Sequence, residues 1–153
     1  MKFLKSTQDK LVFQISAPEK RVLFQALRLY PLVPASYPKL SRGNARPEDQ
    51  QLLEDSLAGQ RAENRRLLLA LMGAESRFVR AGGGFRLELS AAEAECLLQS
   101  LNDVRVGGWL ALGSPDGQEQ IEAALNDETA KYLWAMEVAG FFQMALLQAL
   151  RGE

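Results

Sequence analysis

One local pattern occurs twice in this 153-residue chain and constrains its fold more than any other feature. In each copy a short β-prone run is followed by a serine, and a glutamate comes three residues after the serine. The copies are the run 10–15 with Ser16 and Glu19, and the run 85–89 with Ser90 and Glu93. Serine with glutamate three positions later is the capping box that starts a helix. The pattern therefore predicts two strand–helix units whose strands join one small sheet.

The two units also share several identical residues at a constant offset, between 11–27 and 85–101. Two explanations stay open, namely a true internal duplication and convergence on a common strand–cap–helix pattern. The first helix is predicted to run to about Tyr30, and the second to continue to Leu112.

The remaining elements follow from apolar periodicity and from proline and glycine positions. They are a hairpin strand at 2–5, a long helix from Pro47 to about Met72 that ends at Gly73, a glycine turn at 82–84, a turn at 114–117, a short helix at 118–125 and a final helix at 128–150. The glycine turn precedes a strand, whereas a phosphate-binding loop follows one. We therefore expect a single domain, 1–153, that is mostly α with a small β-sheet (α+β).

Residues 31–47 contain four prolines and a glycine, so they cannot form a regular helix. A segment of this length without regular structure is unusual in a compact domain. Two interpretations stay open, namely a strap that lies extended on the surface and an arm that binds a partner or exchanges between subunits.

The helix predicted at 128–150 is apolar nearly all round. Its large apolar residues are Leu133, Met136, Phe141, Phe142, Met144, Leu146, Leu147 and Leu150. A helix of this kind is usually buried on most sides, and a domain of this size supplies little cover. We therefore expect a homodimer contact through it. The polar residues Glu137, Gln143 and Gln148 favour a buried helix over a membrane span.

Composition excludes several classes of function. The chain has no histidine and a single cysteine, Cys96, which removes the usual base, the commonest metal ligand and any internal disulfide. The net charge of -1 disfavours binding to nucleic acid through phosphates, and the only short basic run is Arg61, Arg65 and Arg66. We expect a cytoplasmic protein without catalytic residues, bound metal, cofactor or membrane segment, and with Cys96 in the core.

Two polar residues fall on apolar helix faces. On a helical wheel Arg105 lies in the apolar sector of its helix, with Asn102 at the border and Asp103 on the opposite side. Asn64 lies in the leucine seam of the helix that starts at Pro47. A buried arginine requires a partner, and Glu137 is the first candidate. Alternatively, the Arg105 side chain reaches water along its aliphatic stem, or it faces a ligand together with a nearby asparagine.

Three stretches resemble an uncharacterised bacterial family, catalogued as domain of unknown function 2017. They are Arg61-Ala62-Glu63-Asn64, the segment Ser90–Arg105 that closes in Leu101-Asn102-Asp103-Val104-Arg105, and Gln143–Leu150. The resemblance implies that Asn64, Asn102, Asp103 and Arg105 act together, and it brings no established activity. Genes of this family often lie beside that of a Clp-protease adaptor, which implies a role in proteostasis. Gly107-Gly108-Trp109 and Ala111 depart from the family pattern.

Three functions are therefore expected from the sequence, in this order. The first is a non-enzymatic cytoplasmic protein–protein interaction or regulatory module that forms a homodimer through 128–150. The second is a sensor of a small anionic ligand that uses Arg105 and a nearby asparagine. The third is a transcription-associated regulator, which requires Arg61, Arg65 and Arg66 to project outward together. An enzyme that uses carboxylates alone requires two acids to converge in a cleft, and no spacing in the sequence indicates such a pair.

Overall fold

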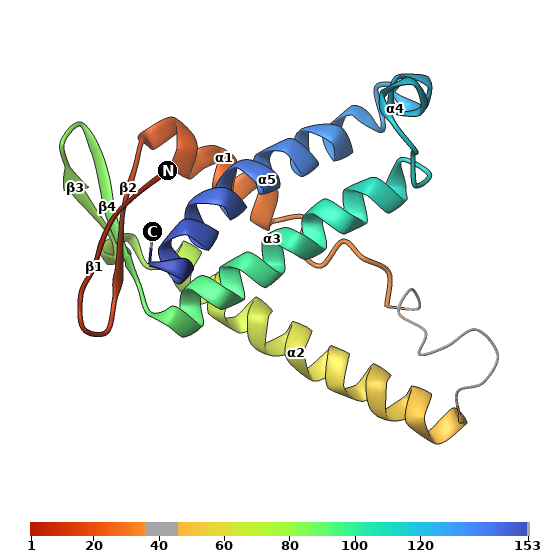
Figure 1. The fold of residues 1–153 in the computed structure, drawn as a ribbon, viewed down its shortest axis with the longest axis horizontal. Helices are drawn as coiled ribbons and strands as arrows, with labels where there is room; N and C mark the ends of the chain where they lie inside the picture. Colours follow the sequence, from red (N-terminus) through yellow and green to blue (C-terminus); the bar gives the residue numbers. More distant parts are fainter. Residues whose placement is uncertain (36–45, 153) are drawn as a thin grey trace.

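A computed structural model describes residues 1–35 and 46–152 (Figure 1). The protein is 64% helical, with a four-stranded antiparallel sheet, so the predicted α+β class with its apolar C-terminal helix is confirmed. The sheet forms one end of the molecule, and the long helices extend from it.

The two predicted central strands, β2 (Leu11–Ile15) and β4 (Gly84–Leu89), lie side by side in the sheet. The predicted hairpin strand is β1 (Lys2–Ser6), which pairs with β2. A fourth strand, β3 (Phe78–Ala81), was missed, and the strand order is β1-β2-β4-β3. The glycine turn is confirmed, because it joins β3 to β4.

Both predicted capping boxes are present. The Ser16 and Ser90 hydroxyl oxygens accept hydrogen bonds from the backbone N–H groups of Glu19 and Glu93, at 3.2 and 3.1 Å. Each glutamate carboxylate in turn accepts from its serine N–H at 2.8 Å. Arg77 forms a two-pronged ion pair with Glu93 and holds the pKa of that carboxyl below its usual value. Local sequence therefore determines where the two helices begin.

The helices that follow the caps pack together on the sheet. Helix α1 (Ala17–Leu27) ends before the predicted Tyr30, whereas α3 (Ala91–Ala111) ends close to Leu112 as predicted. Helix α5 (Ala130–Arg151) packs mainly along α3 and also contacts α1 and β1. The central core side chains, none of them exposed, are Phe13, Ile15, Leu23, Leu87, Leu89, Leu97, Leu101, Val104, Phe142 and Leu146.

A glycine allows α3 and α5 to approach closely. A Cβ atom at Gly108 would lie 2.9 Å from the carbonyl oxygen of Tyr132 and 2.8 Å from Cγ of Met136, both on α5. The antiparallel pair formed by α3 and α5 is the longest contact between helices in the molecule (Figure 1).

Helix α2 (Pro47–Gly73) begins and ends almost as predicted, and it diverges from the rest of the fold (Figure 1). Its buried residues, Asn64, Leu68 and Leu71, all lie in its C-terminal half, where it packs on α3. Leu52 in the N-terminal half is 68% exposed.

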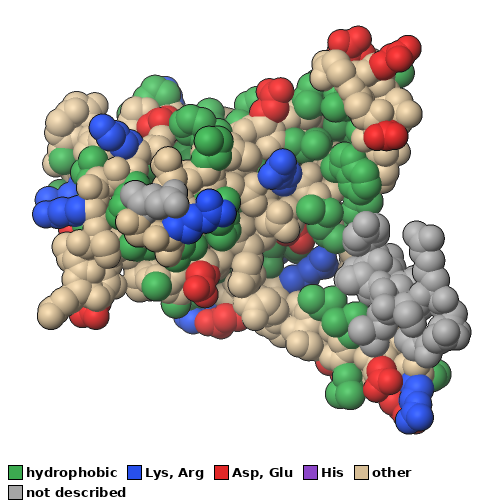
Figure 2. All heavy atoms as spheres, in the orientation of Figure 1, with side chains coloured by type: hydrophobic (Ala, Val, Ile, Leu, Met, Phe, Trp, Pro, Cys, Tyr) green, Lys and Arg blue, Asp and Glu red, His purple; other side chains and the backbone are tan. Residues whose placement is uncertain are grey.

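The short helix α4 (Gln118–Ala124) also forms as predicted. The turn before it lies at 112–113 rather than at the predicted 114–117, where only Gly117 bends the chain. Acidic side chains gather at the end of the molecule where α4 lies (Figure 2). Glu119, Glu122, Asp127 and Glu128 are all exposed, so they form a solvated face.

The predicted strap, 31–47, is described only in part, because 36–45 lie outside the described residues. Residues 31–35 leave α1 without regular structure and run along α3. Leu32 packs directly on Gly107, where an added Cβ would lie 2.6 Å from the leucine Cγ.

As expected for a domain of this size, the single chain leaves part of α5 uncovered. Phe141, Met144 and Leu147 are 51%, 68% and 37% exposed. Within the described residues α5 is the one helix long and apolar enough to cross a membrane, judged by length and composition alone. Its inner face, which includes Ala139, Phe142 and Leu146, nevertheless packs in the core of the fold.

Candidate functional site

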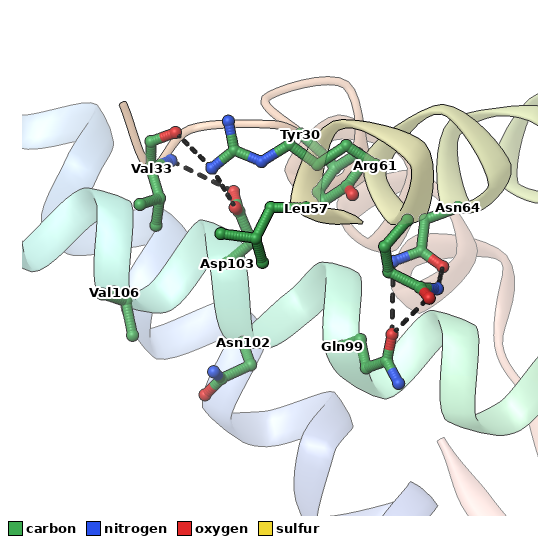
Figure 3. A pocket seen from close by; sticks show the side chains of 10 residues that line it. Tyr30, Val33, Leu57, Arg61, Asn64, Gln99, Asn102, Asp103 and Val106 are labelled. Atoms are coloured by element: carbon green, nitrogen blue, oxygen red, sulfur yellow. Dashed lines mark hydrogen bonds and ion pairs between the residues drawn. The ribbon is translucent and has the colours of Figure 1, made fainter. Parts of the chain in front are cut away.

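Asn64 is buried as predicted, at 4% exposure, between α2 and α3. Its side-chain nitrogen donates to Gln99 Oε1 at 3.3 Å, and its side-chain oxygen accepts from Gln60 at 3.0 Å. Figure 3 shows these amides facing one another across the two helices. The Tyr30 hydroxyl also hydrogen-bonds Asn64, and burial raises the pKa of that phenol. Other side chains therefore satisfy the hydrogen-bonding groups of this buried carboxamide.

Asp103 faces α2 and the start of the strap, on the side of α3 away from Arg105, as the helical wheel predicts. One carboxylate oxygen accepts hydrogen bonds from the backbone N–H groups of Leu32 and Val33, at 2.6 and 3.2 Å. The other lies 3.6 Å from a guanidinium nitrogen of Arg61, which donates to the Val33 carbonyl at 2.8 Å (Figure 3). We call the group Asp103, Arg61, Leu32 and Val33 the strap clasp.

The strap clasp borders a cavity of about 250 Å³ between α2 and α3. Its lining residues are Tyr30, Val33, Leu57, Gln60, Arg61, Asn64, Gln99, Asn102, Asp103 and Val106. The opposite charges of Arg61 and Asp103 cancel across this cavity. Both side chains form hydrogen bonds with the backbone of the strap, so the strap clasp is a structural anchor for that segment.

Arg105 is exposed, so the prediction of a buried guanidinium is wrong. Its side chain makes one long hydrogen bond to the residues that the structure describes, 3.5 Å from Nη1 to Gln143 Oε1. Glu137 is exposed on α5 and pairs with no cation in the described part of the chain, so the expected pair with Arg105 does not form there. The alternative in which Arg105 reaches water along its stem agrees with the structure.

The error has a physical reason. The buried sector that the wheel assigned to α3 omitted Cys96, Ser100 and Gly107, which are also buried. Cys96 contacts α2 and Gly107 contacts the strap, so the buried surface extends to a side of α3 away from Arg105. Ser100 satisfies its hydroxyl locally by donating to the Cys96 carbonyl at 2.8 Å.

Arg105 lines a groove of about 460 Å³ between α3 and α5. We call it the α3–α5 groove, and its lining residues are Leu98, Gln99, Asn102, Arg105, Gly140, Gln143, Met144 and Leu147. Its walls are mostly apolar. Asn102 is exposed between this groove and the cavity at the strap clasp, since it lines both.

The structure thus divides the predicted site residues. Asn64 and Asp103 lie on the α2 side of α3, Arg105 lies on the α5 side, and Asn102 stands between them. Glu137 joins neither cluster. The sequence analysis missed the role of Arg61, although its position one turn before Asn64 places both side chains on one helix face.

The short basic run does not form a basic patch. Arg61 turns inward to the strap clasp, and Arg66 forms an ion pair with Glu63 on its own helix at 2.7 Å. Among the described residues no group of three potential metal ligands comes together. Cys96 is buried as predicted, its thiol donates to the Asn64 carbonyl at 3.7 Å, and burial raises its pKa, which disfavours a reactive thiolate.

No protein family, curated protein or solved structure matches this chain. The resemblance to the uncharacterised bacterial family, and the link to proteostasis that it implies, therefore stay predictions.

Proposed function

We propose that this chain is a non-enzymatic interaction module that forms a homodimer through the outer face of α5. The observation that carries the proposal is the exposure of Phe141, Met144 and Leu147 on one helix, beside the apolar α3–α5 groove. Large apolar side chains that adjoin one another at the surface mark an interaction site.

Two further features support an interface in preference to a catalytic site. Among the described residues that line the cavity at the strap clasp, Asp103 is the only carboxylate, and it already interacts with two backbone N–H groups and Arg61. The inner face of α5 is already used in the core, so a partner has to cover only the outer face.

The test is sedimentation of the wild-type chain and two variants at micromolar concentration. Met144→Lys places a charge in the centre of the exposed face, and we expect it to convert a wild-type dimer into a monomer. Leu52→Lys is the matched control, because Leu52 is equally exposed, at 68%, but lies on α2. We expect it to remain dimeric. A wild-type chain that sediments as a compact monomer would overturn the proposal.

One observation favours a second candidate, the anion sensor. In the described part of the chain Arg105 makes only a long contact to Gln143, and Asn102 lines the same groove, so both side chains have donors for a carboxylate bound there. Titration of the ¹⁵N-labelled chain with acetate is expected to shift side-chain signals of Arg105 and Asn102 at millimolar concentration. Equal shifts in an Arg105→Gln variant would contradict this candidate.

A further inference from the structure

The outer face of α5 carries one acid and one base in symmetrical positions about Met144. Glu137 lies about two helical turns before Met144, and Arg151 lies about two turns after it. All three side chains are exposed. Neither Glu137 nor Arg151 has an ion-pair partner in the described residues.

These three residues form one narrow stripe. Seven residues bring an α-helix back to within about 20° of the same direction, so Glu137, Met144 and Arg151 follow one another along the helix. Phe141 and Leu147 lie on either side of this stripe, about one turn before and after Met144. The stripe therefore has apolar flanks at its centre and opposite charges at its ends.

Most dimers of identical chains have a two-fold axis and present the same patch on both copies. If two α5 helices paired in parallel, Glu137 would face Glu137 and Arg151 would face Arg151, and like charges would repel. If they pair antiparallel about Met144, each Glu137 lies level with an Arg151 of the other copy, and two attractive pairs form. Charge complementarity of this kind selects the orientation of an interface.

We infer that two copies of this chain pair their α5 helices antiparallel, with the two-fold axis beside Met144 and Glu137 of each copy next to Arg151 of the other. The inference rests on the proposed function and adds to it the orientation and the register of the dimer.

The small residue in the groove fits this register. Nothing lies within 4 Å of the position where a Cβ atom of Gly140 would stand, so the groove is open there. In the antiparallel pair Leu147 of one copy arrives beside Gly140 of the other, close to the apolar wall formed by Leu98. The missing side chain at Gly140 thus makes room for a leucine of the partner.

The test is the dimer dissociation constant of charge-reversal variants, measured by sedimentation equilibrium at low salt. Glu137→Arg and Arg151→Glu each replace two attractive pairs with two repulsive ones, so each is expected to weaken the dimer at least about tenfold. The double variant restores both pairs and is expected to return to within about threefold of the wild type. Glu119→Arg on α4 is the control for a change of net charge.

Mixing the two single variants gives an independent measurement. A chain with Glu137→Arg and a chain with Arg151→Glu form two attractive pairs with each other, so the mixture is expected to dimerise as well as the wild type. Thermal unfolding of each variant checks that it folds.

The outcomes separate this inference from the proposed function. A monomeric wild type overturns both. A dimeric wild type that is disrupted by Met144→Lys but unaffected by either charge reversal leaves the proposed function in place and overturns the antiparallel register. Weak dimers of both single variants that the double variant does not rescue also overturn the register.

Discussion

Asp103 illustrates how one side chain connects three segments that are distant in the sequence. It lies on α3, accepts hydrogen bonds from two backbone N–H groups of the strap, and faces Arg61 on α2. The strap at this point has no regular structure that would satisfy its N–H groups, so an acceptor on α3 has to do so. The carboxylate also neutralises a half-buried guanidinium.

Replacing Asp103 with alanine should therefore destabilise the fold by about 1–3 kcal/mol, the usual cost of leaving part-buried donors without an acceptor. Urea denaturation measures the loss. Amide hydrogen exchange at Leu32 and Val33 should accelerate in the same variant. Asp127→Ala removes an exposed carboxylate and serves as the control, with a change below about 0.5 kcal/mol. Unchanged exchange at both strap amides would contradict the assigned role.

At the scale of elements, glycines set how closely the helices of this fold approach their neighbours. Leu32 of the strap packs against Gly107, and α5 packs against Gly108. Both glycines belong to the segment Gly107-Gly108-Trp109, which departs from the pattern of the family that the sequence resembles. Gly59 in the middle of α2 has nothing within 4 Å of its missing Cβ and makes no such contact.

The glycines at 107 and 59 should consequently respond to alanine in opposite directions. Gly107→Ala brings a Cβ to within 2.6 Å of Cγ and 2.7 Å of the backbone carbon of Leu32, so the strap has to move. We expect a loss of about 1–3 kcal/mol. Gly59→Ala should stabilise the protein by about 0.5–1 kcal/mol, since alanine favours a helix. Chemical denaturation of both variants measures the change in the free energy of unfolding. A stabilised Gly107→Ala variant would show that the close contact is absent.

For the whole molecule, the main asymmetry is between the packed end and the diverging half of α2. The sheet, α1, α3 and α5 share one core, whereas α2 adds buried residues to it only from Asn64 onward. Local stability depends on such packing, so it should differ along this single helix.

Backbone amides in the first half of α2, at 51–58, should therefore exchange with solvent at least about tenfold faster than those at 67–71. Hydrogen-exchange mass spectrometry resolves the two halves. The buried part of α3, at 97–104, is the internal reference for slow exchange. Uniform protection along α2 would show that its N-terminal half is covered, for example by a partner.

Signals confined to neighbouring residues determined much of the fold in advance. Each capping box needs only a serine, a glutamate and the backbone between them, so Ser16 and Ser90 could be recognised without any tertiary information. The same holds for proline at the start of α2 and for the strand alternation in β2 and β4. The strand β3 was missed because Phe78–Ala81 is short, although its pairing partner β4 follows directly after the glycine turn.

The tertiary structure alone decided which polar groups meet. The sequence identified Asn64 as a buried amide, but whether Arg105 is buried depends on how α3 rolls against the strap, α2 and α5. Ser100 and Gly107 are buried on α3, and a hydrophobicity pattern gives such small residues little weight. Local hydrogen bonds depend on residues that are close in the sequence, whereas the burial of a side chain depends on contacts with residues that are distant in the sequence. For this reason Arg61, and not Arg105, is the arginine that pairs with the carboxylate of Asp103.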